Sequence, residues 1–371
     1  MKEEKPIRIA QIIGKMWAGG VETVVFNYYR ALDHSKIQFD FYYDADSTVE
    51  PPEDIIEMGA HFYKLSPYQK IWKYLPELKK YFKEKNYVIV HSHLNTLSVF
   101  PLFIAWTVGI PVRIAHNHSV PGGNEWKRNV VKLLLKKFSK VFATDYFACS
   151  EKAGYWLFGN KTFKEGKVKI IKNAIDFQKF SLPYDREKSL KKSLGLTQNV
   201  VYGHIGRFTF AKNHMKLLDI FKILHIRNND ARLLLVGDGE LHDQIYQKIN
   251  RLSLTDSVIC VGKVQNPEVY YSVIDVMILP SYFEGFSMTT IESQVSGVPI
   301  VISKAIPIEA IISDSYQYRD LKDSDEMWAD AAESLLNKTV KLSNRGYEFD
   351  IHRCAPLLQD WYLENYQLKF I

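Results

Sequence analysis

Residues 279–292 read LPSYFEGFSMTTIE, a strand end followed by a glycine-containing loop and the start of a helix. The apolar run Val276–Pro280 is typical of a buried strand, and Ser287–Val295 has helical spacing with Ser287 in the N-cap position. At such a junction the free amides of residues 285–288 and the positive end of the helix can hold an anion. The stretch therefore predicts one unit of an open α/β sheet, with its ligand at the carboxyl end of the strand.

The same alternation of short apolar runs and longer helical segments continues along the chain, which favours parallel sheets over a β-sandwich. In the first half, strands are expected at Ile7–Ile13, Phe39–Asp44, Tyr87–His93, Val112–His118, Tyr146–Ser150 and Val168–Lys172, with helices at Gly20–Leu32, Ile71–Lys85, Thr96–Val108 and Glu125–Phe142. In the second half, strands are expected at Val200–Gly206, Ala231–Gly237, Val258–Gly262, Val276–Pro280 and Pro299–Ser303, with helices at Asn213–Ile226, Leu241–Leu252, Pro267–Ile274 and Ser287–Val295.

Length and composition indicate two domains, because 371 residues with 46% hydrophobic composition exceed one ordinary core. The polar stretch Asp176–Gln198 is interpreted as the linker between them. We expect two doubly wound, Rossmann-like α/β domains over residues 1–178 and 186–352. Phe349–Leu368 is expected to form a final helix, and residues 353–371 to pack back on the first domain.

The cysteines and the apolar segments point to the cytoplasm. Cys149, Cys260 and Cys354 lie far apart without metal-ligand spacing, which fits a reducing compartment. The charged N-terminus resembles no secretory signal. The most apolar stretch, Thr96–Val112, is interrupted by prolines and a glycine, and it is interpreted as a buried helix followed by a strand rather than a membrane span.

The charge of the chain is unevenly distributed. Its formal net charge is +6, yet residues 61–180 carry 21 Lys and Arg against 7 Asp and Glu. This asymmetry suggests that one half meets an anionic surface, either phospholipid or nucleic acid. The segment Glu125–Val141 interleaves apolar residues with lysines, and its helical face contains Val131, Leu134, Leu135 and Phe138. This pattern predicts a helix lying in an anionic membrane interface; the alternative is that its apolar stripe packs on the sheet.

Three further motifs carry candidate binding groups. Arg207 and Lys212 lie five residues apart at a helix entrance, where cations oppose the helix dipole and favour a bound diphosphate. Glu284 and Glu292 bracket the loop quoted above and could accept hydrogen bonds from ligand hydroxyls. Gly19 and Gly20 permit close approach of a ligand, although the spacing is not the dinucleotide fingerprint. For each motif the alternative is ordinary solvated or turn residues. The turn Val236–Gly239 is interpreted as architectural.

Histidines and acidic pairs raise the question of metals. His91 with His93, and His116 with His118, end two strands where open α/β sheets place ligands. No carboxylate accompanies either pair, so we interpret them as hydrogen-bonding groups, with satisfied buried histidines as the alternative. Asp44-Ala45-Asp46 and Asp323-Ser324-Asp325 have a D-x-D form, which can hold a divalent metal ion.

Together these residues resemble the retaining family 4 glycosyltransferases of the GT-B fold, particularly those of bacterial capsule and exopolysaccharide assembly. The glutamate pair, the Arg207 and Lys212 pair, Gly19-Gly20 and P-S-x-x-E-G-F occur in the family's order over nearly the whole chain. In that fold two Rossmann-like domains face one another across a cleft. The resemblance implies a nucleotide-sugar donor, with UDP-sugar favoured by family frequency. It also implies a glycan or lipid-linked acceptor.

The resemblance also implies roles for individual residues. Arg207 and Lys212 would bind the donor diphosphate, Glu292 the ribose hydroxyls and Glu284 the hexose hydroxyls. The remaining donor-binding residues would be Gly19, Gly20, Lys263, Val264, Gly285, Phe286 and Ser287. His116 matches the family's active-site histidine, with His93 and His118 on the acceptor side.

Cations and amides would stabilise the charge of the leaving diphosphate, so neither a metal nor a cofactor is expected. In the family's front-face mechanism a phosphate oxygen of the leaving group takes the acceptor proton, which explains why the sequence shows no flanking nucleophile and acid pair. Two rival functions remain open from the sequence: a nucleotide-sugar 2-epimerase of the same architecture, and a basic RNA-binding protein built on Tyr68–Lys85 and Trp126–Lys140. No RNA-binding module signature accompanies the charge, so nucleic acid is not expected as a partner. We expect the protein to lie peripherally on the inner face of the cell membrane.

Overall fold

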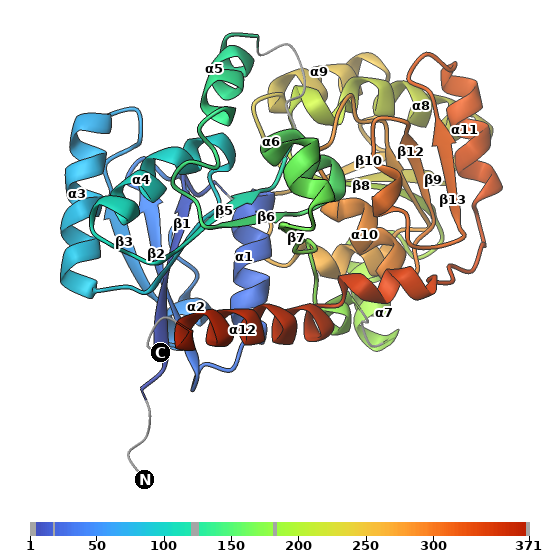
Figure 1. Ribbon diagram of the computed structural model, residues 1–371. Coiled ribbons are helices and arrows are strands. Elements are labelled where there is room, and N and C mark those ends of the chain that lie inside the picture. Colours follow the sequence, from blue (N-terminus) through green and yellow to red (C-terminus); the bar gives the residue numbers. More distant parts are fainter. Residues whose placement is uncertain (1–4, 18, 120–125, 181–183, 369–371) are drawn as a thin grey trace. The chain divides into compact units, whose positions relative to one another are not determined.

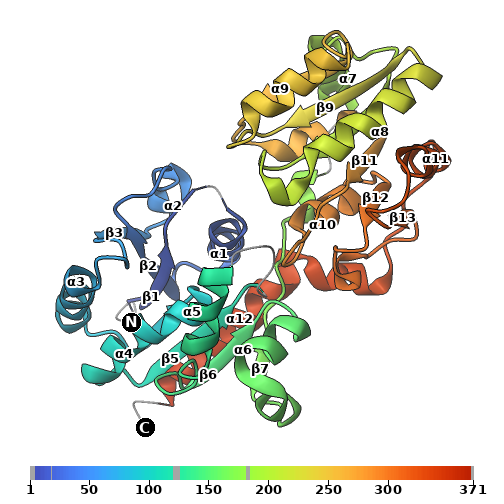
Figure 2. The same ribbon diagram turned by 90° about the horizontal axis from the view of Figure 1, so that it is seen from above.

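The computed structural model describes residues 5–17, 19–119, 126–180 and 184–368, and for 126–129 and 184 the backbone alone (Figure 1). The chain divides into two compact units. The first contains Met1–Ile175 and Glu348–Ile371, and the second contains Asp176–Tyr347. Helices cover both sides of the sheet in each unit (Figures 1 and 2).

The first unit is a parallel sheet with the strand order β3-β2-β1-β4-β5-β6-β7. Its strands are β1 Ile7–Gly14, β2 Ile37–Asp44, β3 His61–Leu65, β4 Ile89–Ser92, β5 Val112–Asn117, β6 Asp145–Ala148 and β7 Val168–Ile170. Its helices are α1 Gly20–Ala31, α2 Glu53–Glu57, α3 Ile71–Lys85, η1 Asn95–Ser98, α4 Val99–Thr107, α5 Trp126–Lys136, α6 Glu151–Lys164 and α12 Ile351–Gln367.

The second unit is a parallel sheet with the order β10-β9-β8-β11-β12-β13. Its strands are β8 Val200–Ile205, β9 Ala231–Val236, β10 Val258–Gly262, β11 Val276–Leu279, β12 Ile300–Ser303 and β13 Tyr316–Arg319. Its helices are η2 Phe177–Phe180, α7 Tyr184–Ser193, η3 Phe210–Lys212, α8 His214–Arg227, α9 His242–Arg251, η4 Pro267–Val273, α10 Met288–Val295, η5 Ile308–Ala310 and α11 Asp325–Ser334; η6 Asn344–Phe349 leads back to the first unit.

The central strands explain why these sequences form parallel sheets. β9 and β11 are apolar along almost their whole length and buried on both faces, as strands covered by helices on both sides must be. The strand order reverses between β1 and β4 in the first sheet and between β8 and β11 in the second. Open α/β sheets bind ligands at the carboxyl ends of the strands at such a reversal. The fold therefore marks one ligand edge in each unit.

Several elements differ from the sequence expectation. The strands β3 and β13 and the helices α2, α6, α7 and α11 were not predicted. β3 and β13 each flank only one neighbour and keep polar, half-exposed residues, so their apolar signal is weak. α6 is interrupted at Gly159, where φ is 84°. The stretch expected as a linker contains η2 and α7, and the second unit begins at Asp176.

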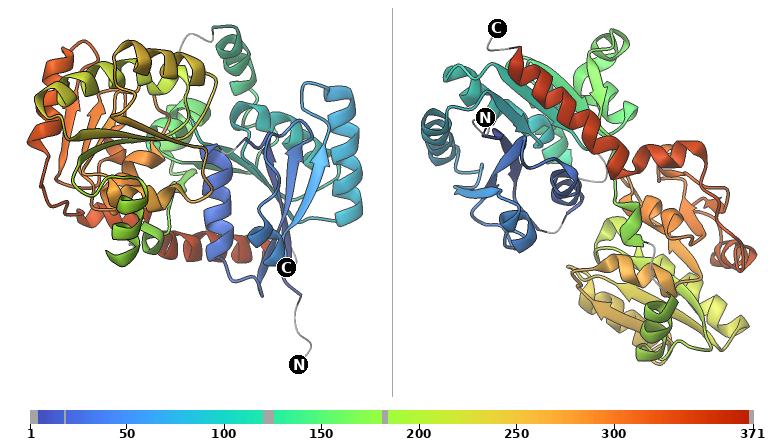
Figure 3. Two further views of the ribbon diagram at one scale, coloured as in Figure 1. Left: turned by 180° about the vertical axis from the view of Figure 1, so that it is seen from behind. Right: turned by 90° about the horizontal axis from the view of Figure 1, so that it is seen from below.

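The C-terminal helix α12 belongs to the first unit. It packs beside α1, and Figure 3 shows it lying across the first sheet. Tyr362 is 1% exposed, and its ring lies edge-on to Phe39 with centroids 5.9 Å apart. No helix among the described residues is long and apolar enough to cross a membrane.

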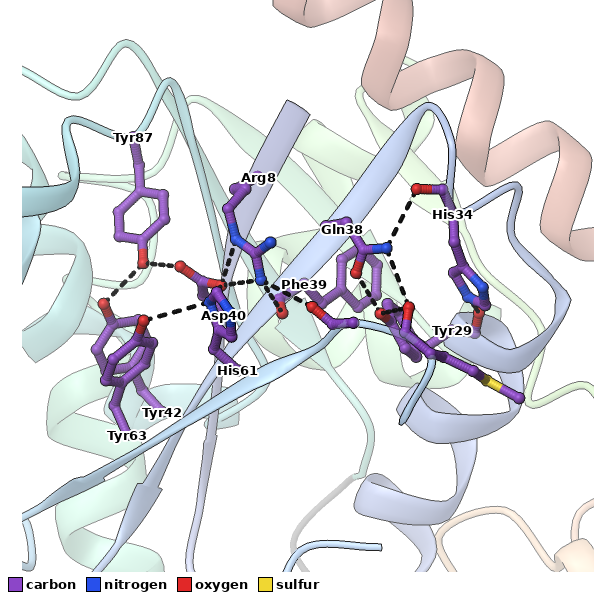
Figure 4. A network of polar contacts seen from close by, with 12 residues as sticks. Arg8, Tyr29, His34, Gln38, Phe39, Asp40, Tyr42, His61, Tyr63 and Tyr87 are labelled. Atoms are coloured by element: carbon purple, nitrogen blue, oxygen red, sulfur yellow. Dashed lines mark hydrogen bonds and ion pairs between the residues drawn. The ribbon is translucent and has the colours of Figure 1, made fainter. Parts of the chain in front are cut away.

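A polar network centred on the buried carboxylate of Asp40 links β1, β2 and β3 to the segment just before β4 (Figure 4). Asp40 is 1% exposed and lies 2.6 Å from the guanidinium of Arg8 and 3.2 Å from the ring of His61. The hydroxyl of Tyr87 donates to Oδ2 of Asp40 at 2.5 Å, and the hydroxyls of Tyr87 and Tyr42 lie 2.8 Å apart. Burial raises the pKa of both phenols, so they remain neutral donors. We call these residues the Asp40 network.

Candidate active site

Two loops of the second unit are fastened together at its ligand edge. One follows β8 and the other follows β11. The amide of Tyr282 donates to the carbonyl of Ala211 at 2.8 Å, and the side-chain amide of Asn213 donates to the carbonyl of Pro280 at 3.0 Å. The rings of Phe210 and Tyr282 stack with centroids 4.7 Å apart. These contacts give the two loops a fixed relative position.

Lys212 and Glu284 form an ion pair between these loops. The ammonium of Lys212 lies 2.7 Å from the carboxylate of Glu284, and the side chains are 17% and 13% exposed. Ser281 also donates to this carboxylate, at 3.0 Å. Arg207 is an exposed residue on the same β8 loop. The structure therefore brings together Lys212 and Glu284, residues taken from two separate sequence motifs.

Glu292 is held from a third element. The hydroxyl of Tyr271 in η4 donates to its carboxylate at 2.7 Å. Burial raises the pKa of Glu292, while the Tyr271 hydrogen bond and then Lys212 act against that shift. The ring of Phe180 lies edge-on to Tyr271, with centroids 5.7 Å apart. Glu292 is thus a fixed hydrogen-bond acceptor in α10 rather than a freely solvated helix residue.

The helix α10 begins where predicted, directly after Ser287. Ser287 occupies the N-cap position and is 1% exposed, but its side chain makes no capping hydrogen bond. Its hydroxyl oxygen instead accepts from the hydroxyl of Thr290 at 2.8 Å. Gly285 and Phe286 are half-buried beside it. The predicted N-cap position of Ser287 is therefore confirmed, although its side chain does not cap the helix.

The loops after β9 and β10 border the same edge. A Cβ on Gly237 would lie 2.0 Å from the carbonyl oxygen of Gly206, and one on Gly239 would lie 2.6 Å from that of Phe208. The architectural interpretation of Val236–Gly239 is confirmed by these close backbone approaches. Among the predicted donor residues after β10, Lys263 is exposed and Val264 is half-buried.

In the first unit the glycine pair precedes and opens α1. The carboxylate of Glu22 accepts hydrogen bonds from the amides of Trp17 at 2.8 Å and Gly19 at 3.0 Å. The Gly19 amide is therefore already engaged. A Cβ on Gly19 would approach Glu22 to 2.9 Å, whereas one on Gly20 would meet no atom of the described residues within 4 Å. Gly20 is thus the residue of the pair with open space beside it.

The two histidine pairs come together at the carboxyl ends of β4 and β5. His91, His93, His116 and His118 are 1–6% exposed, and we call them the histidine cluster. The ring nitrogens of His91 and His116 lie 3.0 Å apart, and those of His93 and His118 lie 2.9 Å apart. Burial lowers the pKa of all four imidazoles, and that of His118 falls to about 3. The cluster is consequently neutral.

Two nitrogens of the cluster have no hydrogen-bond partner among the described residues: Nε2 of His116 and Nδ1 of His118. The remaining ring nitrogens bond within the cluster or to Gln11 and Tyr362. The sequence analysis did not identify Gln11, Tyr362, Tyr271 or Ser281 as residues of the site. Only Ser281 carried a signal, since it belongs to the quoted P-S-x-x-E-G-F motif.

The two D-x-D motifs have different surroundings. Asp325 accepts from Lys216 at 2.8 Å, and the carboxylate of Asp323 accepts from the amide of Asp320 at 2.9 Å. In the first unit Asp46 lies 2.8 Å from Lys15, and Asp44 is buried. Three of these four carboxylates therefore already have a partner within the chain.

Family models match most of the chain. The model for glycosyl transferases group 1 matches residues 185–349, and that for glycosyltransferase family 4 matches residues 18–179. The putative glycosyltransferase EpsF of Bacillus subtilis (strain 168) is 30% identical over 305 residues, covering 81% of this chain and 79% of that protein. This chain therefore belongs to the glycosyltransferase family that these two models describe. It is an enzyme of that class.

Other relatives extend the likeness. The capsular polysaccharide biosynthesis glycosyltransferase CapH of Staphylococcus aureus is 24% identical, covering 97% of this chain and 99% of that protein. The UDP-Gal:alpha-D-GlcNAc-diphosphoundecaprenol alpha-1,3-galactosyltransferase of Escherichia coli is 29% identical, covering 63% of this glycosyltransferase and 62% of that protein.

Solved structures share the fold. That of Anabaena Alr3699/HepE in complex with UDP-glucose superposes with a TM-score of 0.77 at 18% identity, covering 96% of this chain and 100% of that one. With two Rossmann-like parallel-sheet units and neighbours of this kind, the glycosyltransferase has the GT-B type of fold. The sequence prediction of fold and family is confirmed.

Proposed function

We propose that this glycosyltransferase moves a sugar from a nucleotide-sugar donor, with UDP-sugar favoured, to a hydroxyl of a glycan or lipid-linked acceptor in capsule or exopolysaccharide assembly. The observation that carries the proposal is the fastened loop pair at the β8 and β11 ligand edge, with Lys212, Glu284 and Glu292 on it. The names of the relatives in Staphylococcus aureus and Escherichia coli, and the UDP-glucose bound to the Anabaena protein, support these substrate classes.

The side chains at this edge suit a sugar attached to a diphosphate. Lys212 and Arg207 would neutralise the diphosphate that leaves when the anomeric bond breaks, and the amides at the start of α10 would add hydrogen bonds. Glu284 and Glu292 would accept from the hexose and ribose hydroxyls. Lys263 and Val264 would line the base. Because cations and amides of the protein stabilise the leaving group, this mechanism requires neither a metal nor a cofactor.

Retention of configuration follows from the proposed front-face path. The acceptor hydroxyl attacks the anomeric carbon from the side on which the diphosphate leaves, and a phosphate oxygen takes the hydroxyl proton. His116 would contact the donor sugar, with His93 and His118 towards the acceptor. No carboxylate nucleophile is then needed. The anomeric configuration of the product, read from its proton couplings, tests retention.

The first experiment is a thermal-shift screen of the purified protein against UDP-, GDP- and ADP-sugars. A UDP-sugar should give the largest stabilisation, because ligand binding to the native state raises its stability. Incubation with that donor alone separates transfer from 2-epimerisation: an epimerised donor without acceptor would replace transfer as the function. Activity that disappears after chelation and returns with Mn²⁺ would contradict the metal-independent mechanism.

We also propose that the enzyme docks peripherally on the anionic inner face of the cell membrane through α5 and the residues after it. Several apolar side chains there are 48–60% exposed rather than packed on the sheet: Val130, Val131, Leu133, Leu134, Phe138 and Val141. Lys136 and Lys140 adjoin them, although they also contact Trp156 and Thr162 within their own unit. Exposed apolar residues among lysines fit a phospholipid interface better than an RNA backbone.

Sedimentation with phosphatidylglycerol vesicles tests this surface. One variant replaces Val131, Leu134 and Phe138 by Ser, and a second replaces Lys132, Lys136, Lys137 and Lys140 by Gln. Each variant should bind the vesicles less than the wild type does, and the lysine variant should bind least. The matched control changes four lysines of α3, namely Lys73, Lys79, Lys80 and Lys83, to Gln. Undiminished binding in both α5 variants would show that the docking surface is wrong.

A further inference from the structure

One chain of hydrogen bonds runs through the histidine cluster and through two other buried side chains, Gln11 of β1 and Tyr362 of α12. Gln11 is 0% exposed and Tyr362 is 1% exposed. The side-chain amide nitrogen of Gln11 lies 3.3 Å from the Tyr362 hydroxyl, and its carbonyl oxygen lies 2.8 Å from Nε2 of His93. Gln11 is therefore the midpoint of the chain, with one arm leading to His116 and the other to His118.

The arm through Tyr362 has a fixed direction. The amide nitrogen of Gln11 can only donate, so the phenol oxygen accepts from it. The one hydrogen of the phenol then goes to Nδ1 of His91, which lies 2.6 Å away. A neutral His91 with a bare Nδ1 carries its hydrogen on Nε2 and donates to Nδ1 of His116 at 3.0 Å. His116 is left with its hydrogen on Nε2, the atom without a partner.

The second arm runs the opposite way. The carbonyl oxygen of Gln11 can only accept, so His93 donates to it from Nε2 and its Nδ1 is bare. That bare nitrogen accepts from Nε2–H of His118, at 2.9 Å. Nδ1 of His118, the second atom without a partner, is consequently a bare acceptor. All four histidines therefore have the same Nε2–H tautomer.

The neutrality of the cluster supports this reasoning. Burial, followed by the neighbouring histidines for His91, His93 and His116, lowers the pKa of the imidazoles, so one hydrogen is shared between the two nitrogens of each ring. With one hydrogen for each ring, and with the Gln11 amide nitrogen directed to Tyr362, every remaining hydrogen position is determined. The two free ends are then complementary, since one donates and the other accepts.

We propose that Gln11 and Tyr362 are positioning residues that fix His116 as a hydrogen-bond donor through Nε2–H and His118 as an acceptor through Nδ1. Such a pair matches sugar hydroxyls, which both donate and accept. The sugar as ligand rests on the proposed function, whereas the tautomers do not. The proposal also predicts that loss of the Tyr362 hydroxyl lets only His91 and His116 change tautomer, while His93 and His118 keep theirs.

A metal site is the rival interpretation of the same residues. One nitrogen each from His91, His93 and His116 lie within 4.8 Å of one another. A metal ion needs bare nitrogens aimed at one point. In this arrangement His91 and His116 are already bonded to each other, and His93 is bonded to Gln11. Metal binding would break these hydrogen bonds. The two interpretations therefore predict different imidazole spectra and different metal contents for the purified protein.

The direct test uses ¹H–¹⁵N spectra of the imidazole rings in the full chain, which has 11 histidines, assigned with single His→Gln variants. All four cluster histidines should show the Nε2–H tautomer. In Tyr362→Phe, His91 and His116 should populate both tautomers while His93 and His118 keep Nε2–H. Gln11→Met should release both arms. With donor and acceptor supplied, kcat should fall about threefold to tenfold in Tyr362→Phe, with KM for the donor little changed.

Tyr28→Phe is the matched control. Tyr28 is likewise buried, at 4% exposed, and its hydroxyl donates to the carbonyl of Lys172, which is not part of this hydrogen-bond network. It should leave the cluster spectra and kcat unchanged. Nδ1–H tautomers in the wild type, a response to Tyr362→Phe no larger than that to Tyr28→Phe, or stoichiometric zinc in the purified protein would each overturn the proposal. The spectra require no substrate, so failure of the proposed function would leave the tautomer result intact.

Discussion

The first sheet carries two buried polar networks that end differently. The Asp40 network, near the amino ends of the strands, is closed: both carboxylate oxygens of Asp40 have partners. The histidine cluster, at the carboxyl ends of β4 and β5, is open: His116 and His118 each retain a nitrogen without a partner among the described residues. The four histidines are almost fully buried; in the Asp40 network Asp40, Tyr42 and Tyr87 are buried, whereas Arg8 and His61 are partly exposed.

The difference teaches how the same kind of residue serves fold or chemistry. A buried polar atom without a partner costs free energy, so a chain that ends on two such atoms is poorly explained as packing alone. A closed network has no atom left to offer a ligand. We therefore expect changes in the Asp40 network to cost stability and changes at the carboxyl ends of the strands to cost turnover.

The largest effect is expected from Asp40→Asn. Removing the charge of the buried Asp40 takes away the charged partner of Arg8, whose guanidinium then keeps only its hydrogen bonds to the carbonyls of Phe39 and Gly59. This loss should lower the free energy of unfolding by about 3 kcal/mol. Turnover for each folded molecule should remain at the wild-type level. Urea unfolding and kcat, measured on the same preparation, check this pair of outcomes. A tenfold loss of turnover with unchanged stability would contradict the comparison.

His116→Gln should give the opposite result. If Nε2–H of His116 contacts the donor sugar, turnover should fall about 100-fold, within the range found for positioned side chains. Unfolding should shift less than for Asp40→Asn, because glutamine can still bond to His91. Steady-state kinetics with the donor identified by the thermal-shift screen provide the measurement. Near wild-type turnover would remove His116 from the site.

The ligand edge of the second unit extends the comparison. Lys212→Ala and Glu284→Gln should each lower turnover more than tenfold while the fold persists, because both residues would contact the donor. Lys216→Ala is a matched control, since Lys216 is similarly shielded at 16% exposed and pairs with Asp325 at 2.8 Å. Wild-type turnover in either site variant, or an equal loss in the control, would withdraw the donor-site assignment.

The sequence predicts the fold better than it predicts these networks. Long apolar runs such as Ala231–Gly237 and helical spacing over Ile71–Lys85 specify their elements locally, and both were predicted almost to the residue. The edge strand Tyr316–Arg319 was missed, because its side chains are all half-buried and show no alternation.

The candidate site follows the same rule. Glu284, Glu292, Arg207 and Lys212 were found because glycines and helix starts mark their loops. Gln11, Tyr271 and Tyr362 act through partners far away in sequence; Gln11 and Tyr362, for example, are separated by 351 positions. Local pattern carries no record of such a pairing, so only the folded chain identifies them.

A smaller effect separates the two glycines before α1. A methyl group on Gly20 would enter open space, whereas one on Gly19 would crowd the Glu22 carboxylate. If the donor approaches Gly20, Gly20→Ala should raise KM for the donor about fivefold, equivalent to about 1 kcal/mol, without lowering Tm. Gly19→Ala should lower Tm. An unchanged KM in Gly20→Ala would indicate that no ligand reaches this loop.

The last prediction is an effect of pH on stability and concerns Asp44, four residues after Asp40 in the same strand. Asp44 is 2% exposed and its Oδ2 has no hydrogen-bond partner among the described residues. Burial, and then the charge of Asp46, raise its pKa to about 7 against the opposing effect of Lys15. In the unfolded chain the pKa of an aspartate is about 3.9.

The sign of the pH dependence follows from this difference. Because the folded state binds the Asp44 proton more tightly, the contribution to stability is fully present below the unfolded pKa of about 3.9 and is lost as the pH rises towards the folded pKa of about 7. The side chain of Asp44→Asn cannot ionise, so the variant should have a higher Tm than the wild type at pH 8 and a smaller advantage at pH 5. Each kcal/mol of unfolding free energy corresponds to about 2–4 °C in Tm. Asp40→Asn, which loses a paired carboxylate, should be less stable than the wild type at both pH values. Thermal unfolding of the three proteins at pH 5 and pH 8 gives the answer: a gain for Asp44→Asn that does not grow between these pH values would show that the Asp44 carboxyl does not titrate there.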